Sequence, residues 1–202
     1  MRLLPLLALL GAGLALTACG GGSGDGDEEE IRAVIAASAT STNPADCRRY
    51  GTMNMLERSF KVQGQAAVRA CEESKLEVRD LPTAVEVTRI EIDGADATAQ
   101  VASVGGLYPE QEVVIALVEE DGSWKEDSAL EFALFDREAF ILEFGREIMG
   151  NARTPAQAQA SACLIGRMER LSDAELEALL LGPSPQPIAD LARPCEPRSE
   201  AL

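Results

Sequence analysis

Residues 113–127, VVIALVEEDGSWKED, decide the fold class of this chain. The first half is a continuous run of apolar and β-branched residues, which predicts a central β-strand with both faces buried. Asp121-Gly122 then supplies the residue pair that favours a two-residue hairpin turn. A last strand begins after this turn, and its even positions predict an inward face formed by Trp124, Leu130, Phe132 and Leu134.

Two more strands precede this hairpin. The segment TAVEVTRIEI, residues 83–92, alternates with a period of two, but its apolar positions change parity after Val87. A one-residue change of phase turns every later side chain to the other face, so we expect a β-bulge at residues 88–89. Asp93-Gly94 predicts another hairpin turn before the strand ATAQVASV. The four strands together predict an antiparallel meander.

Helical periodicity precedes the strands. Ile31, Val34 and Ile35 share one face of a first helix. Asn43 and Pro44 favour the start of a second helix. The apolar stripe of that helix consists of Cys47, Tyr50, Met53, Leu56 and Phe60. A third, short helix is predicted over GQAAVRACEES. The three helices are available to cover the apolar face of the sheet, which predicts an α+β fold.

Residues 136–202 are predicted to form a helical extension. Asp136 can cap its first helix, and a later capping box opens a helix at Ser172. The first of these helices carries an apolar stripe formed by Phe140, Phe144 and Ile148. A segment of this size makes a thin core of its own. We therefore expect the extension to dock on the sheet domain through this stripe.

The N-terminus combines a short apolar run with a cysteine. Residues 3–16 are too few to span a membrane as a helix, and they fit the apolar part of a signal peptide. The tetrapeptide Leu16-Thr17-Ala18-Cys19 is similar to a bacterial lipobox. This resemblance implies that residues 1–18 are a lipoprotein signal peptide and that Cys19 carries a diacylglycerol. The alternative is an ordinary signal peptide with a chance cysteine.

Lipidation of Cys19 would determine the cellular location of the protein. Lipid on Cys19 predicts a protein anchored in the cell membrane and facing outside the cytoplasm, because several acyl chains together make a stable anchor. Residues 19–28 are rich in glycine and acidic residues, so we expect a disordered tether between the lipid and the folded part.

The four other cysteines are an even number in a chain that is predicted to be exported. This favours two disulfides, for which three connectivities exist. Proximity in the sequence favours Cys47 with Cys71 and Cys163 with Cys195. A zinc site is the rival interpretation, but the chain contains neither a Cys-x-x-Cys pair nor any histidine, so no metal is expected.

The composition narrows the range of partners. The formal net charge is −16, which disfavours nucleic acid and anionic lipid headgroups as direct partners. The chemistry of the chain points to no cofactor, since neither a phosphate-binding loop nor a cluster of metal ligands is present in the sequence.

The order of three helices and four antiparallel strands resembles the NTF2-like, cystatin-like fold of bacterial lipoproteins. The resemblance is carried by IRAVIAASATSTNPADC, AAVRAC, IEIDGADATAQV and VVIALVEEDGSWKED. It implies an NTF2-like domain over residues 29–135, in which a curved sheet wraps a cone-shaped pocket. The residues expected to line this pocket are Tyr50, Trp124 and Phe132. Residues 136–202 lie outside the resemblance.

Two functions remain open at this point. The first is a non-catalytic binding or accessory module of the cell envelope, which takes a small apolar ligand or an envelope protein as its partner. The second is an enzyme of the ketosteroid-isomerase or dehydratase type, which needs a carboxylate base and an oxyanion donor. Tyr50 is a candidate donor, but no aspartate falls at an inward position, so no catalytic residue is assigned.

Overall fold

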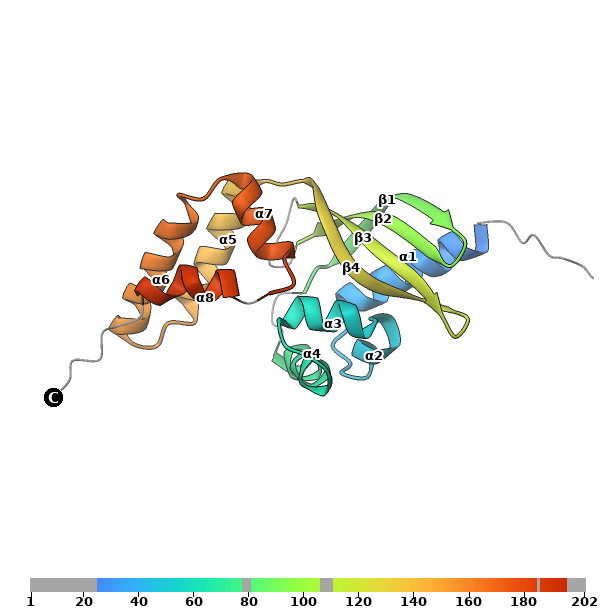
Figure 1. The fold of residues 1–202 in the computed structure, drawn as a ribbon, viewed down its shortest axis with the longest axis horizontal. Helices are drawn as coiled ribbons and strands as arrows, with labels where there is room; N and C mark the ends of the chain where they lie inside the picture. Colours follow the sequence, from blue (N-terminus) through green and yellow to red (C-terminus); the bar gives the residue numbers. More distant parts are fainter. Residues whose placement is uncertain (1–24, 78–80, 106–110, 185, 196–202) are drawn as a thin grey trace, which may run out of the picture.

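The computed structural model describes residues 25–77, 81–105, 111–184 and 186–195. Cys19 and the predicted signal peptide lie outside these residues. The described part has an α+β fold with a four-stranded antiparallel sheet in the order β1-β2-β3-β4, which confirms the predicted fold class (Figure 1). The strands are β1 (Ala84–Asp93), β2 (Asp96–Val104), β3 (Glu112–Glu120) and β4 (Ser123–Leu134).

Helices precede and follow the sheet. Before it come α1 (Asp25–Thr40), α2 (Asp46–Tyr50), α3 (Met53–Phe60) and α4 (Gln65–Glu77). After it come α5 (Arg137–Gly150), α6 (Pro155–Met168), α7 (Asp173–Leu181) and α8 (Gln186–Ala192). Below, α1 to β4 are called the sheet domain, and the elements from α5 onward are called the C-terminal extension.

The predicted local features of the sheet are present. The pairing of β1 with β2 shifts register between Val87 and Arg89, where the bulge is expected. Asp121 and Gly122 both have positive φ angles, of 55° and 76°, as the hairpin turn between β3 and β4 requires. At the first hairpin the turn is displaced by one residue, because Asp93 still pairs with Asp96.

The prediction of one continuous inward face on β4 is wrong. The pairing of β3 with β4 shifts register at three places, and the even positions of β4 are buried only as far as Ser128. Leu130 is consequently 49% exposed, and Leu134 is exposed as well. The sequence of β4 does not reveal these shifts, because its large apolar residues all stand at even positions, as they would in a regular strand.

The main core lies between α1 and one face of the sheet. Ile31 and Ile35 of α1 pack against Leu117 of β3 and Trp124 of β4, all of them buried. Helix α1 begins at Asp25. The prediction of a disordered tether over residues 19–28 is therefore wrong for residues 25–28, which are helical. The acidic residues in its first turn favour this early start, because they complement the positive end of the helix dipole.

The expected second helix is divided into α2 and α3. Gly51 and Thr52 interrupt it, because the Thr52 backbone N–H donates to the Glu126 carbonyl of β4 at 2.8 Å. Thr52 also serves as the N-cap of α3, and its hydroxyl oxygen accepts from the Met55 N–H at 3.1 Å. The interruption therefore ties the helical cover to the edge strand of the sheet.

Both disulfides join the predicted partners. Cys47 and Cys71 connect α2 to α4 across a Cα–Cα distance of 6.0 Å, and both residues are buried. Cys163 and Cys195 connect α6 to the short 3-10 helix after α8 across 5.6 Å. The first disulfide belongs to the sheet domain and the second to the C-terminal extension.

The C-terminal extension docks by a different route from the one predicted. Helices α6 and α7 fold back on α5, so Phe140 packs with Met168 and Leu176 in a separate core instead of on the sheet. Contact with the sheet domain is made by α7, as Figure 1 shows beside β4 and α3.

Arg58 of α3 and Lys61, the C-cap residue of α3, cap the C-terminal end of α7. Arg58 donates to the Leu181 carbonyl at 3.1 Å, and Lys61 donates to the carbonyls of Leu180 and Gly182. These contacts favour docking, because cations are stabilising at the negative end of a helix dipole. Gln111 adds a second joint by exchanging two hydrogen bonds of 2.9 Å with the backbone of Asp136.

Candidate functional site

The structure brings two of the three predicted pocket residues together. Trp124 lies in the core between α1 and the sheet, and Tyr50 packs against the same cluster. Phe132 is elsewhere: its ring lies 4.8 Å from that of Phe135, which leads to Phe140 of the extension at 5.7 Å. Phe132 therefore belongs to the junction between the two parts of the chain.

Glu126 of β4 is a buried acid that the sequence interpretation missed. Glu126 is only 8% exposed, and its carboxylate accepts a hydrogen bond of 3.0 Å from the Ser38 hydroxyl of α1. The Lys75 ammonium of α4 donates to the Ser38 backbone carbonyl at 2.6 Å. Three elements thus meet at this carboxyl group.

Burial raises the pKa of Glu126 to about 7, because desolvation penalises the charged carboxylate. The hydrogen bond from Ser38 and the charge of Lys75 act in the opposite direction but are outweighed. Burial also lowers the pKa of Lys75, although Glu126 and Asp46 partly counteract this. Glu126 therefore exchanges its proton near neutral pH.

A signal for Glu126 was present in the sequence. It stands two residues after Trp124, on the inward parity of β4. Asp127 lies on the other parity, where it accepts from Thr52 and Asn54 at 2.8 Å. A buried carboxyl group that has no hydrogen-bond partner in the protein is the plainest sign of a catalytic base. Glu126 does not meet this criterion, because its carboxylate accepts a hydrogen bond from Ser38.

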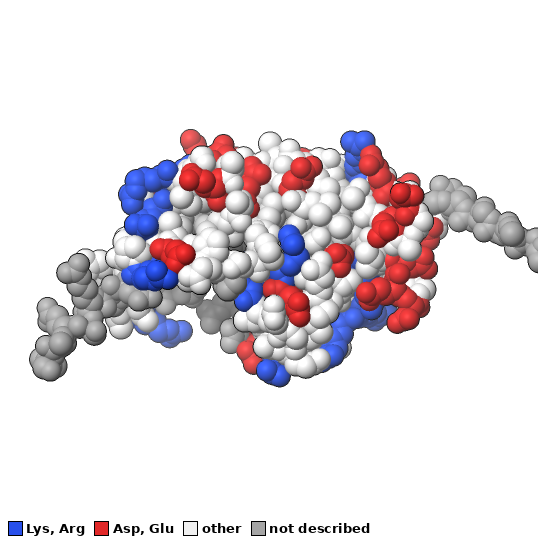
Figure 2. Space-filling model, viewed as in Figure 1, with Lys and Arg blue, Asp and Glu red and all other residues white. Residues whose placement is uncertain are grey.

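Acidic side chains gather at one end of the sheet domain. Figure 2 shows them over the start of α1 and the tips of the two β-hairpins. The exposed acids of the hairpin tips are Asp93, Asp96, Glu119, Glu120 and Asp121. This charge disfavours anionic partners at that end of the molecule.

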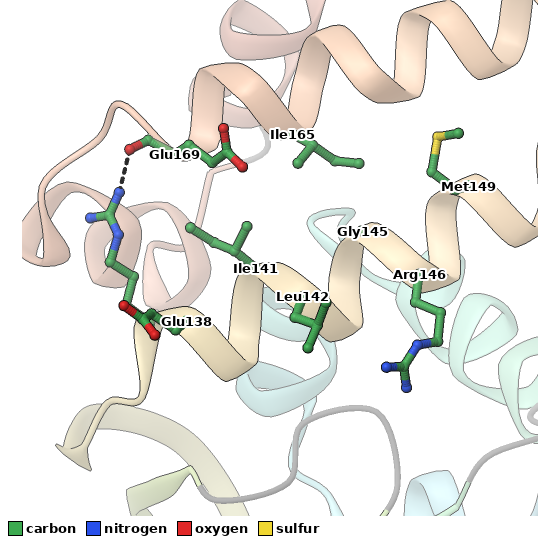
Figure 3. Close-up of a pocket in the computed structure, with 9 residues that line it drawn as sticks. Glu138, Ile141, Leu142, Gly145, Arg146, Met149, Ile165 and Glu169 are labelled. Atoms are coloured by element: carbon green, nitrogen blue, oxygen red, sulfur yellow. Dashed lines mark hydrogen bonds between the residues drawn. The ribbon is translucent and has the colours of Figure 1, made fainter.

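An open groove lies between α5 and α6 of the C-terminal extension. Its volume is about 670 Å³, and Figure 3 shows Ile141 and Ile165 facing each other across it. The lining residues are Arg137, Glu138, Ile141, Leu142, Gly145, Arg146, Met149, Ile165 and Glu169. Leu142 is 61% exposed and Met149 is 42% exposed, so the groove presents apolar surface to solvent.

Gly145 sets the depth of the groove. A Cβ atom at this position would lie 3.3 Å from the Cδ1 atom of Ile165, so the glycine permits α6 to approach α5 closely. Ile141, Gly145 and Met149 recur every four residues and form one row along α5. The groove thus runs along this row of α5, and the missing side chain of Gly145 leaves a depression at its centre.

The two arginines at the rim are paired within the chain. Arg137 donates to the Glu169 carbonyl at 2.6 Å, the contact dashed in Figure 3, and forms an ion pair with Asp173 at 3.1 Å. Arg146 pairs with Glu143 at 2.8 Å. The floor of the groove is therefore its main recognition feature, with polar groups along the edges.

The described residues contain no group of three or more side chains suited to hold a metal ion. Among the helices that the structure describes, none has both the length and the apolar character needed to cross a membrane. No protein-family model matches the chain, and neither does any curated protein or solved structure.

Proposed function

We propose that this protein is a lipid-anchored accessory module of the cell envelope that binds an amphipathic helix of a partner protein in the α5–α6 groove. The open apolar groove carries the proposal. An NTF2-like fold of the sheet domain is part of it, supported by helices that precede and cover an antiparallel meander. We do not extend the proposal to catalysis, because the hydrogen bond from Ser38 occupies the buried carboxylate of Glu126.

The shape of the groove supports a helical occupant. The row Ile141, Gly145 and Met149 lies beside Ile165 of α6 and Glu169, the C-cap residue of α6, which are also four residues apart. Rows with this spacing interdigitate with the same rows of another helix. The α5 row is about 12 Å long at 1.5 Å per residue, which corresponds to about two turns of a bound helix. Binding an apolar helix face in such a groove is a common mode of peptide recognition.

The first test concerns the anchor. Replacing Cys19 by serine removes the thiol that the lipid would modify, so we expect the protein to leave the membrane fraction and to lose metabolic labelling with a fatty-acid analogue. Cys163→Ser, which also replaces one cysteine by serine, is the matched control and should remain in the membrane fraction. Unchanged membrane association of Cys19→Ser would contradict lipid anchoring, whatever the groove binds.

The second test concerns the groove. A photo-crosslinking amino acid at Leu142, introduced in cells, should give one adduct with the mass of a partner protein. Met149→Glu should reduce this adduct about tenfold or more, because burying a methionine side chain contributes roughly 1.5–3 kcal/mol. Both residues are exposed, so these changes leave the core intact.

Leu130 provides the control for this experiment. It is 49% exposed on β4 and is not among the residues that line the groove. The same crosslinker at Leu130 should not give the adduct, and Leu130→Glu should not reduce the adduct formed from Leu142. Adduct formation that is insensitive to Met149→Glu, or an adduct with lipid alone, would overturn the proposed helical partner.

A further inference from the structure

A polar cluster lies beside the buried disulfide of the sheet domain. The cluster consists of Glu126, Ser38 and Lys75, joined by the hydrogen bonds of 3.0 and 2.6 Å described above. Lys75 stands four residues after Cys71 on α4, so the two side chains share one face of this helix. The cluster therefore holds α4 at the point where the disulfide joins it to α2.

The charged groups around Glu126 come from several elements. Lys75 faces it from α4, and Asp46 of α2 lies near Lys75 while accepting a hydrogen bond from Ser41. Helix α1 contributes the Ser38 hydroxyl. The same helix contributes Glu30, whose carboxylate accepts a hydrogen bond of 3.3 Å from the backbone N–H of Trp124 on β4. From β3 the cross-strand partner is the apolar Leu117. Lys75 is thus the cation nearest to the buried acid in this set.

We propose that this cluster is a proton-operated latch, which holds α4 and α2 on the sheet when Glu126 is protonated and releases them as the pH rises, thereby exposing the Cys47–Cys71 disulfide. The disulfide makes α2 and α4 move as one unit. Its two cysteines are only 4% and 5% exposed, so a reductant reaches them after the cover opens.

The direction of the effect follows from proton linkage. Burial raises the pKa of Glu126 to about 7 in the closed state, whereas a solvated glutamate has its ordinary value of 4.5. Between these values the closed state holds a proton that the open state releases, so rising pH favours opening. Above pH 7 both states are ionised and the effect levels off.

The test compares the reduction rates of the two disulfides in the full chain. A phosphine reductant is added between pH 5 and 8.5, and mass spectrometry follows each bond. Relative to Cys163–Cys195, the reduction rate of Cys47–Cys71 should rise by up to about tenfold per pH unit from pH 5 to 7 and then level off. The second disulfide is the internal reference, because Cys163 is already exposed.

Three variants make the test specific. Glu126→Gln should remove the pH dependence of the rate ratio, whereas Glu131→Gln, an exposed acid on the same strand, should keep it. Ser38→Ala removes a hydrogen bond that lowers the pKa of Glu126, so the levelling-off should move to higher pH. Ser38→Ala also keeps the proposal testable if Glu126→Gln does not fold.

Two results would overturn the latch. The first is a rate ratio that stays constant from pH 5 to 8.5 in the unmodified protein, or that varies equally in Glu126→Gln. The second is a loss of Trp124 fluorescence over the same pH range, since that would mean unfolding of the whole sheet domain instead of opening of its cover.

Discussion

Replacing Leu176 by alanine is expected to unfold the C-terminal extension while the sheet domain stays folded. Leu176 is fully buried with Phe140 and Met168, and a leucine-to-alanine change at such a site costs about 2–5 kcal/mol. The extension has a small core, so this loss is a large share of its stability. Far-UV circular dichroism should show early melting of helix, while the fluorescence of Trp124 changes little.

The single tryptophan of the chain makes this experiment readable. Trp124 lies in the core of the sheet domain, so its emission reports on that domain alone. Leu142→Ala is the matched control, since Leu142 is exposed on α5 of the same extension and should change the unfolding midpoint little. If Leu176→Ala shifts both signals together and equally, the two parts unfold as one cooperative unit although they have separate cores.

Such coupling would have to pass through a narrow junction. The polar contacts described above are the hydrogen bonds from Arg58 and Lys61 to the end of α7 and the exchange between Gln111 and Asp136. The desolvation of Lys61 lowers its pKa, so part of the gain from capping α7 is offset by burying a cation. The aromatic contact of Phe132 with Phe135 is the apolar component of the same junction.

Features encoded within a few residues could be read from the sequence. Asp121-Gly122 specifies its turn because both residues must take positive φ angles, and the change of parity after Val87 specifies the bulge in β1. The two disulfides could also be predicted, since each joins the cysteines that are nearest in the chain. In all these cases the local pattern and the final structure have the same physical cause.

Features decided by packing between distant segments could not be read in the same way. The break between α2 and α3 depends on a hydrogen bond from Thr52 to Glu126, and the irregularities of β4 appear only against β3. The burial of Phe140 depends on α6 and α7 folding back on α5. The sequence pattern predicts helices in this region but not their arrangement. The burial of Glu126 likewise depends on α1 and α4, which contribute Ser38 and Lys75 beside it.

Removing the disulfide of the sheet domain is the second change with a large expected effect. The double variant Cys47→Ala, Cys71→Ala should lower the free energy of unfolding by about 3.5 kcal/mol, because the open chain regains the entropy of a loop of 24 residues. The loss should appear in the denaturant transition of Trp124 fluorescence. The reason is that α2 and α4 cover the domain in which Trp124 is buried.

The other disulfide provides the comparison. The double variant Cys163→Ala, Cys195→Ala opens a loop of 32 residues, for which the same chain-entropy model gives nearly the same loss. This loss should be confined to the helical signal of the C-terminal extension, leaving the Trp124 transition in place. Two variants with nearly equal entropic cost thus address two different cores. If the second double variant lowers the Trp124 midpoint as much as the first, the extension stabilises the sheet domain through the α3–α7 junction, and the groove between α5 and α6 is held by the whole molecule.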